Sequence, residues 1–214
     1  EGGAAAGHER DEDADGDPGQ PRRVYTVTYA AAGSEAFRPA YDPITPADDD
    51  EIRSVGFMDL EGDGMHEVEV TGICGAGPNC AGTLYKLDPD TGTLYPFFDG
   101  AWARIQVVDG HVVEGGRASC CAWEYHAWPL LPGQRPRVSK TMAFRVSVGA
   151  SIDSEREDVS CRFTRPVADG DDVLISPPNT HWLPLCTVYG EDYHLARRTR
   201  RTLAATASRT DSNG

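Results

Sequence analysis

The segment of the sequence best suited to chemistry is a short acidic run that begins at Asp59. Carboxylates stand at its first, third, fifth and ninth positions, with a glycine at the sixth and a methionine at the seventh. Hard oxygen ligands at this spacing suit Ca²⁺, and the glycine allows the sharp turn that a calcium loop needs. Without a cation, four carboxylates so close together would be strongly unfavourable. The run therefore predicts a Ca²⁺ site with the ligands Asp59, Glu61, Asp63, Glu67 and the backbone carbonyl of Met65.

Two strands, rather than two helices, are expected to hold this loop. The helix-loop-helix calcium motif has a bidentate glutamate at position 12, where this sequence has Val70. The residues on both sides of the loop read as strands. We therefore expect a compact strand-loop-strand site closed by Glu67. The alternative interpretation is an acidic hairpin turn whose side chains are solvated.

Apolar and polar residues alternate along the body of the chain, and this period of two predicts an all-β fold. Turn residues separate the apolar runs at 88–92, 109–110 and 169–170. About a dozen short antiparallel strands in one domain suit a propeller-like array, a sandwich or a barrel. A charged stretch at 151–158 is the only helix candidate. The expected strands are 24–29, 52–58, 68–70, 83–87, 94–98, 102–108, 111–113, 119–128, 141–148, 159–164, 173–175 and 185–189.

Composition separates this body from two tails. Residues 1–21 are acidic and hold no apolar side chain larger than alanine, so we expect this segment to be disordered. Residues 22–192 form the predicted all-β calcium-binding domain. Residues 193–214 carry five arginines among alanines and threonines, which predicts a basic flexible tail. A weak amphipathic helix on anionic lipid is the alternative for that tail.

Charge and hydropathy narrow the choice of partner. The 34 acidic and 20 basic residues give a formal net charge of −14, which argues against a nucleic acid and favours a basic protein or a cation. No apolar run is long enough to cross a bilayer. The sequence starts at Glu1 without an apolar leader, so we expect membrane attachment only through a lipid anchor at a trimmed end.

The six cysteines predict disulfides and export. Their number is even, they show no zinc-type spacing, and a composition rich in Arg, Ala, Gly and Asp is typical of a GC-rich bacterial genome, which makes the periplasm or the medium the expected location. Cys74 and Cys80 bracket a short loop and are expected to pair. Cys120 and Cys121, adjacent on a predicted strand, should point to opposite faces and reach Cys161 and Cys186 in either order. The alternatives are a vicinal disulfide or redox pair at 120–121, and six reduced cysteines in the cytosol.

Two places could contact a partner. Glu124, His126 and Trp128 share one face of the predicted strand 119–128, where they would form an aromatic and ionisable patch. An ordinary half-exposed strand face is the alternative interpretation. Asn79 would present a polar tip on the loop between Cys74 and Cys80.

No sequence motif of an enzyme is present. We find no Gly-x-Ser-x-Gly, His-Glu-x-x-His or Walker pattern, and the six histidines are scattered. We therefore expect a binding protein rather than an enzyme. A hydrolase whose carboxylates meet only in three dimensions is the alternative.

Several of these segments together resemble a known family. The run from Asp59 to Gly64 followed by Glu67 resembles the calcium loop of FG-GAP and integrin-type propeller repeats. With the segments 72–80, 84–92 and 116–125 it is similar to small periplasmic FG-GAP-like lipoproteins of proteobacteria. Some of these are immunity proteins against lysozyme-like effectors of type IV secretion systems, related in fold to invertebrate-type lysozyme inhibitors. The resemblance covers residues 50–130.

This resemblance, with the acidic charge, gives three hypotheses. The first is an exported, calcium-stabilised immunity protein that inhibits a lysozyme-like peptidoglycan hydrolase, or binds another basic protein. The second is an FG-GAP-type calcium-binding adhesion or scaffold module without inhibitory activity. The third is a hydrolase with an unrecognised site. A neighbouring gene for a lysozyme-like effector would favour the first, tandem copies of the calcium loop the second, and an acidic pair in a deep cleft the third.

Overall fold

In the residues that it describes, the computed structural model consists of strands and one 3-10 helix. It describes residues 4–12, 22–31, 33–40, 52–88, 90–151, 158–168 and 171–196. The elements in chain order are β1 (Ala4–Glu12), β2 (Arg22–Ala30), β3 (Arg38–Pro39), β4 (Ser54–Met58), β5 (Glu67–Cys74), β6 (Cys80–Asp88), β7 (Thr93–Trp102), β8 (Arg104–Val108), β9 (His111–Ser119), β10 (Ala122–Leu131), β11 (Arg137–Val138), β12 (Phe144–Ser151), β13 (Asp158–Arg165), β14 (Val173–Ile175), η1 (Thr180–Tyr189) and β15 (His194–Leu195).

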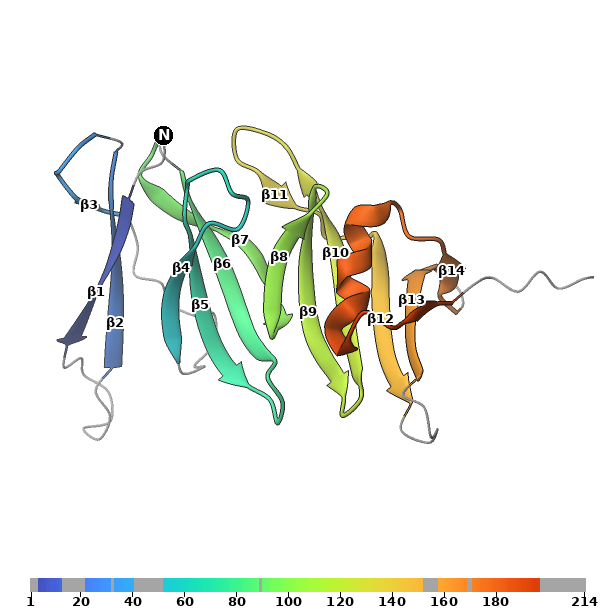
Figure 1. Cartoon of the computed structure of the whole chain (residues 1–214). Helices are drawn as coiled ribbons and strands as arrows, with labels where there is room; N and C mark the ends of the chain where they lie inside the picture. The colour runs from blue at the N-terminus through green and yellow to red at the C-terminus, as the bar shows by residue number, and fades with distance from the viewer. Residues whose placement is uncertain are drawn as a thin grey trace, which may run out of the picture.

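The strands form three sheets that follow one another along the molecule in chain order (Figure 1). The first has the order β1-β2-β3 and the second β4-β5-β6-β7. The third, called the large sheet below, has the order β14-β13-β12-β10-β9-β8, with β11 beside β10 and β15 beside β13. All pairs are antiparallel except β13 with β15. The all-β prediction is confirmed, and in the described ranges no sheet closes into a barrel.

Two of the predicted turns are hairpin turns that depend on their glycines. Asp109 and Gly110 join β8 to β9 with φ angles of 48° and 71°, as a two-residue turn of the primed type requires. Gly92 ends the β6–β7 turn with a φ of 69°. A Cβ at Gly92 would lie 2.6 Å from the hydroxyl of Tyr29, so this glycine also lets the first sheet approach the second.

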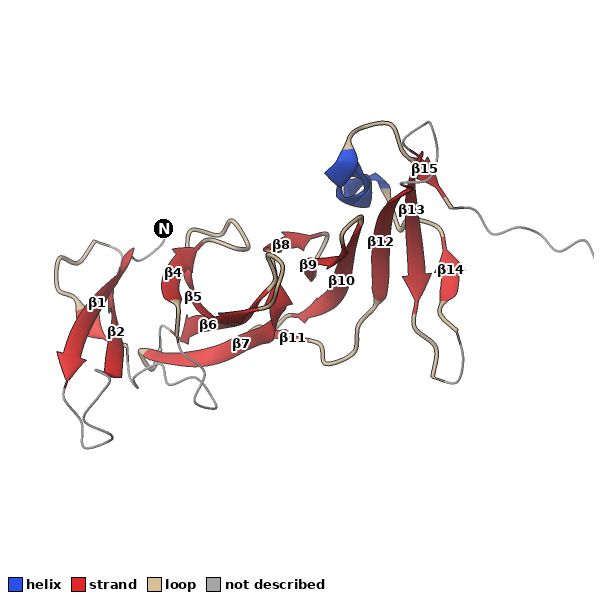
Figure 2. Ribbon diagram, turned by 90° about the horizontal axis from the view of Figure 1, so that it is seen from below, coloured by secondary structure: helices blue, strands red, loops and turns tan. Residues whose placement is uncertain are grey.

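The largest core lies between the large sheet and η1, which covers one side of it (Figure 2). Trp182 of η1 is fully buried and meets Phe144 edge to face, with ring centroids 4.6 Å apart. A disulfide between Cys161 and Cys186 joins η1 to β13. This side of the large sheet is therefore occupied by the helix.

Two smaller apolar clusters join the three sheets. Val27 and Ala40 of the first sheet region pack with Val68 and Val70 of the second. The second sheet meets the large sheet through a seam of buried residues, which are Leu84, Phe97, Phe98, Trp102 and Val112. Burial of such side chains stabilises a contact between sheets by roughly 1.5–3 kcal/mol each.

The helical segment differs from the prediction, which had a strand at 185–189. Asn179 caps the helix by accepting a hydrogen bond from the backbone N–H of His181 at 2.9 Å. Pro184 within the segment has no N–H for a sheet ladder. The strand prediction is therefore wrong here.

The ends of the body also differ from the prediction. Ala4–Glu12, expected to be disordered, pairs along its whole length with β2, and main-chain hydrogen bonds offset part of the ordering entropy. Residues 1–3 and 13–21 lie outside the described residues, as do 197–214 of the predicted basic tail. Ser151 pairs with Asp158 across β12 and β13, so both ends of the helix candidate are strand, and 152–157 also lie outside the described residues.

Candidate functional site

The predicted calcium loop connects β4 to β5, so its flanks are strands as expected. Both carboxylate oxygens of Asp59 accept backbone hydrogen bonds, from the N–H groups of Asp63 and Gly64, each at 3.0 Å. Asp63 Oδ1 accepts the N–H of Met65 at 2.8 Å. Asp59 and Asp63 are exposed, and their hydrogen bonds shape the turn around Gly62 and Gly64, whose φ angles are 71° and 82°.

The other two carboxylates, Glu61 and Glu67, bind a lysine on another strand, which the spacing of the loop does not predict. Lys86 of β6 places its Nζ 2.5 Å from Glu61 Oε2 and 3.0 Å from Glu67 Oε1. Glu67 is only 1% exposed, and its Oε2 also accepts the N–H of Leu60 at 2.8 Å. Lys86 Nζ lies 4.7 Å from the ring centroid of Phe97.

These contacts change the charge of the loop. Burial by itself would lower the pKa of Lys86, but the hydrogen bonds and charges of Glu61 and Glu67 raise it above its ordinary value. Lys86 is therefore a protonated ammonium that supplies part of the positive charge that the four carboxylates of this segment require. Lys86 lies two residues after buried Leu84 and on the same face of β6. A lysine at this position of an alternating strand was the sign in the sequence that its side chain is buried.

The five predicted ligands thus lie on one loop but serve two different arrangements. Asp59 and Asp63 bind the loop backbone, whereas Glu61 and Glu67 bind Lys86. Across the described ranges, no three His, Cys, Asp or Glu side chains are grouped as metal ligands. Binding of Ca²⁺ by this loop stays a prediction.

The predicted patch on β10 lies on the side of the large sheet that η1 does not cover. We call this side the polar face. Its main residues come from β9, β10 and β12, and they are Glu114, Glu124, His126, Trp128 and Arg145.

Strand register brings the ionisable groups of the polar face together. His126 pairs with Glu114 of β9, and its Nδ1 lies 3.0 Å from Glu114 Oε1. Trp128 Nε1 donates to the same oxygen at 3.3 Å, while its ring packs against Phe98 in the seam. On the other side, His126 is paired with Arg145 of β12. Alternation along β10 predicts three of these residues, whereas Glu114 and Arg145 come close to them only through strand pairing.

A depression of about 530 Å³ opens beside this patch. Its charged lining consists of Glu124, Arg145, Arg162, Asp171 and Asp172. Asp172 Oδ2 lies 3.4 Å from Arg145 Nη1 and accepts a hydrogen bond from Thr164 Oγ1 at 3.2 Å. Two buried nitrogen atoms of this face, His126 Nε2 and Arg145 Nε, have no hydrogen-bond partner in the described part of the chain, although His126 Nε2 lies 3.8 Å from Glu124 Oε2. The face therefore offers charges of both signs.

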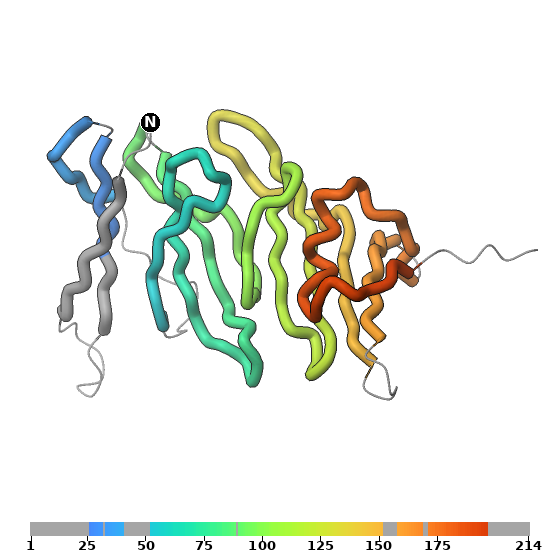
Figure 3. Tube along the Cα trace, in the orientation of Figure 1, coloured from blue at the N-terminus to red at the C-terminus, as the bar shows by residue number. Residues whose placement is uncertain are grey.

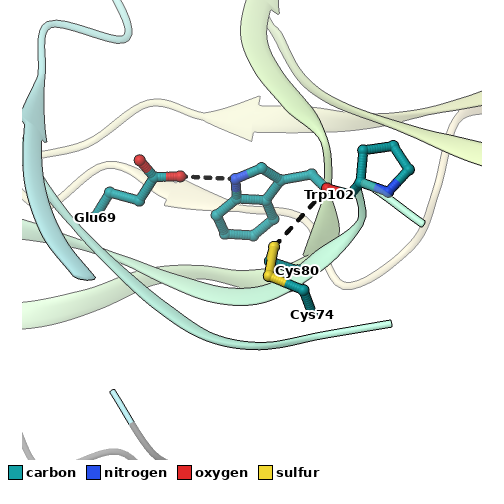
Figure 4. The surroundings of a disulfide bond; sticks show 5 residues. Glu69, Cys74, Cys80 and Trp102 are labelled. Atoms are coloured by element: carbon teal, nitrogen blue, oxygen red, sulfur yellow. Dashed lines mark hydrogen bonds between the residues drawn. A yellow bond between two sulfur atoms is a disulfide. The ribbon is translucent and has the colours of Figure 1, made fainter. Parts of the chain in front are cut away.

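The Cys74–Cys80 disulfide is formed as predicted (Figure 4). The indole of Trp102 lies between it and Glu69, and its Nε1 donates to Glu69 Oε1 at 2.8 Å. Asn79, expected to be a polar tip, binds the neighbouring β9–β10 hairpin instead. Its Nδ2 donates to the carbonyl of Arg117 at 3.0 Å, and its Oδ1 accepts the N–H of Arg117 at 2.8 Å. The tips of the two hairpins lie at the same edge of the molecule (Figure 3).

The predicted pairing of the remaining cysteines is wrong. Cys161 and Cys186 pair with each other, and Cys120 and Cys121 are free. Ser119 pairs directly with Ala122, so Cys120 and Cys121 form a hairpin turn and do not point to opposite faces of a strand. Two disulfides are typical of proteins from oxidising compartments. No helix in the described residues is long and apolar enough to span a membrane.

No family model matches the sequence, and no curated protein matches it. A solved structure titled "Structure of a Xanthomonas Type IV Secretion System related protein" superimposes with a TM-score of 0.46 and 16% sequence identity. The match covers 82% of this chain and 90% of that one.

Proposed function

We propose that this chain is an exported binding protein that inhibits a basic, lysozyme-like peptidoglycan hydrolase through its polar face. The observation that carries the proposal is the charged depression on that face, whose lining includes Arg145 and Asp172. Charged side chains of a protein partner would pair there with side chains of the opposite sign. Carboxylate or carbonyl oxygens of the partner would bind Arg145.

The acidic side chains of this depression suit a basic partner. Glu124, Asp171 and Asp172 line the depression and would meet lysine or arginine side chains of the target. The net charge of −14 would speed the encounter at long range. The sequence resemblance to immunity proteins adds the class of target, a lysozyme-like enzyme.

Calcium enters the proposal as a stabiliser of the fold. Asp59, Asp63 and the carbonyl of Met65 are the predicted ligands that Lys86 does not engage. A Ca²⁺ ion held by these groups would bind the folded chain only, and so add to its stability.

The test is a turbidity assay of peptidoglycan hydrolysis with a panel of basic muramidases. We expect inhibition of at least one enzyme at micromolar concentration. Arg145→Gln should weaken that inhibition about tenfold or more. Arg53 is exposed and directly precedes β4. Arg53→Gln changes the net charge by the same amount as Arg145→Gln and should leave inhibition unchanged.

Two results would count against the proposal. If the two variants inhibited equally well, the polar face would not be the contact. If the unmodified chain left every enzyme fully active, the inhibitor function would be lost and the scaffold function would take its place. The control is the melting temperature of each variant. A value equal to that of the unmodified chain shows that a loss of inhibition is not caused by unfolding.

A further inference from the structure

Two adjacent cysteines make up the whole turn between β9 and β10. Ser119 and Ala122 are paired at the ends of the two strands, so only Cys120 and Cys121 connect them. Cys120 is exposed and Cys121 is half-buried. Their Sγ atoms are 2.6 Å apart, closer than the contact distance of two unbonded sulfur atoms.

The backbone of this turn is held by its neighbours. Arg117 Nη2 donates to the carbonyl of Cys120 at 2.8 Å, and the N–H of Ala150 donates to the carbonyl of Cys121 at 2.9 Å. The N–H of Cys121 donates to Ser119 Oγ at 3.3 Å. With both carbonyls bound, the two side chains project from a fixed loop, and little rearrangement is needed for their sulfur atoms to meet.

The other cysteines are separate from this pair. Cys74 is bonded to Cys80, and Cys161 is bonded to Cys186, with both of the latter fully buried. The thiols of Cys120 and Cys121 are therefore the reactive sulfur atoms of the folded chain, and each has the other as its nearest partner.

We propose that Cys120 and Cys121 form a thiol–disulfide exchange site that oxidises reversibly to a vicinal disulfide. The thiolate of the exposed Cys120 attacks one sulfur of an external disulfide R–S–S–R, forms a mixed disulfide and releases R–S⁻. The thiolate of Cys121 then attacks Cys120 Sγ, forms the Cys120–Cys121 bond and releases the second R–S⁻. The two thiol protons end on the released thiolates, so the chain loses two hydrogen atoms and R–S–S–R becomes two R–SH.

The difference between the two thiols supports this order. The hydrogen bond with Cys120, together with burial, raises the pKa of the Cys121 thiol above its ordinary value, against the lowering effect of the nearby Arg117. Cys121 therefore keeps its proton while Cys120 reacts with the external disulfide. The site is independent of the proposed inhibition, because it needs only the hairpin turn.

The experiment uses the full chain, mildly reduced under native conditions, desalted and exposed to oxidised glutathione. Trypsin then releases both cysteines on one peptide, 118–137, because the bond after Arg135 precedes a proline. We expect this peptide to lose two hydrogen atoms by mass spectrometry and to regain them with dithiothreitol. The proposal is overturned if the peptide keeps two free thiols, retains glutathione or is linked to another cysteine peptide.

Two variants test the order of attack. Cys121→Ser should stop at a stable glutathione adduct on Cys120, whereas Cys120→Ser should gain glutathione much more slowly. Ala118→Ser, an exposed neighbour on β9, should react like the unmodified chain. An adduct on Cys121 but none on Cys120, in variants that melt with the unmodified chain, would overturn the proposed order.

Discussion

Replacement of Lys86 by methionine should destabilise the protein strongly. Lys86 is 8% exposed, and its ammonium is the partner of Glu67, which is 1% exposed. Methionine keeps most of the side-chain volume but leaves a buried carboxylate without its positive charge. Removal of one partner from a buried ion pair costs about 3–5 kcal/mol. For a chain of this size that corresponds to a fall in melting temperature of about 10 °C.

The chain provides a matched control for this variant. Lys140 is the other lysine and is exposed, so Lys140→Met should change the free energy of unfolding by no more than about 0.5 kcal/mol. Combining Lys86→Met with Glu67→Gln should recover most of the loss, because the buried charge is then removed as well. Urea unfolding measures the free energy of unfolding of the unmodified chain, of the two single variants and of the double variant. If Lys86→Met unfolded at the same urea concentration as Lys140→Met, the assignment of Lys86 as the internal counter-charge would be refuted.

Three further predictions concern the calcium loop, a turn and the partner. Ca²⁺ at about a hundredfold its Kd should stabilise the chain by about 2.7 kcal/mol, and Asp63→Ala should abolish that gain; a melting temperature unchanged by a chelator would exclude it. Burial would raise the pKa of Asp88, but Arg135 and the N–H of Asp90 lower it overall, so its contribution to stability is present above about pH 3.9 and lost as pH falls through the lowered value. Arg135→Gln should therefore reduce the loss of stability on acidification, which thermal melts between pH 2 and 6 would measure, and parallel curves for both chains would contradict it. For an inhibited muramidase, the association rate should fall steeply with salt and the dissociation rate much less, as surface plasmon resonance would record; equal salt dependence of both would argue against steering by charge.

The strands were predictable because their signal is local. Alternation along the sequence located strands in all three sheets, but not β1, which was expected to be disordered, nor the two-residue strands β3, β11 and β15. Asp109-Gly110 marked a hairpin turn by its backbone requirement. The β9–β10 turn was missed because Ser119, Cys120, Cys121 and Ala122 include no glycine, proline or asparagine. That single error also produced the wrong cysteine pairing.

The candidate site was only partly predictable, because its partners come from different strands. Alternation placed Glu124, His126 and Trp128 on one face, but only the pairing of β9, β10 and β12 adds Glu114 and Arg145. Likewise the acidic loop was evident, whereas the lysine that neutralises two of its carboxylates lies on β6. A single sequence does not contain these contacts in any local pattern.

The proposed inhibitor function requires that the polar face binds a basic lysozyme-like enzyme. The most direct test is to measure the inhibition constant of the unmodified chain against each enzyme of a muramidase panel. The same constants are measured for the Arg145→Gln and Arg53→Gln variants. We expect an inhibition constant in the micromolar range or lower for at least one enzyme, raised about tenfold by Arg145→Gln and unchanged by Arg53→Gln. Full activity of every enzyme at micromolar concentrations of the chain would contradict it.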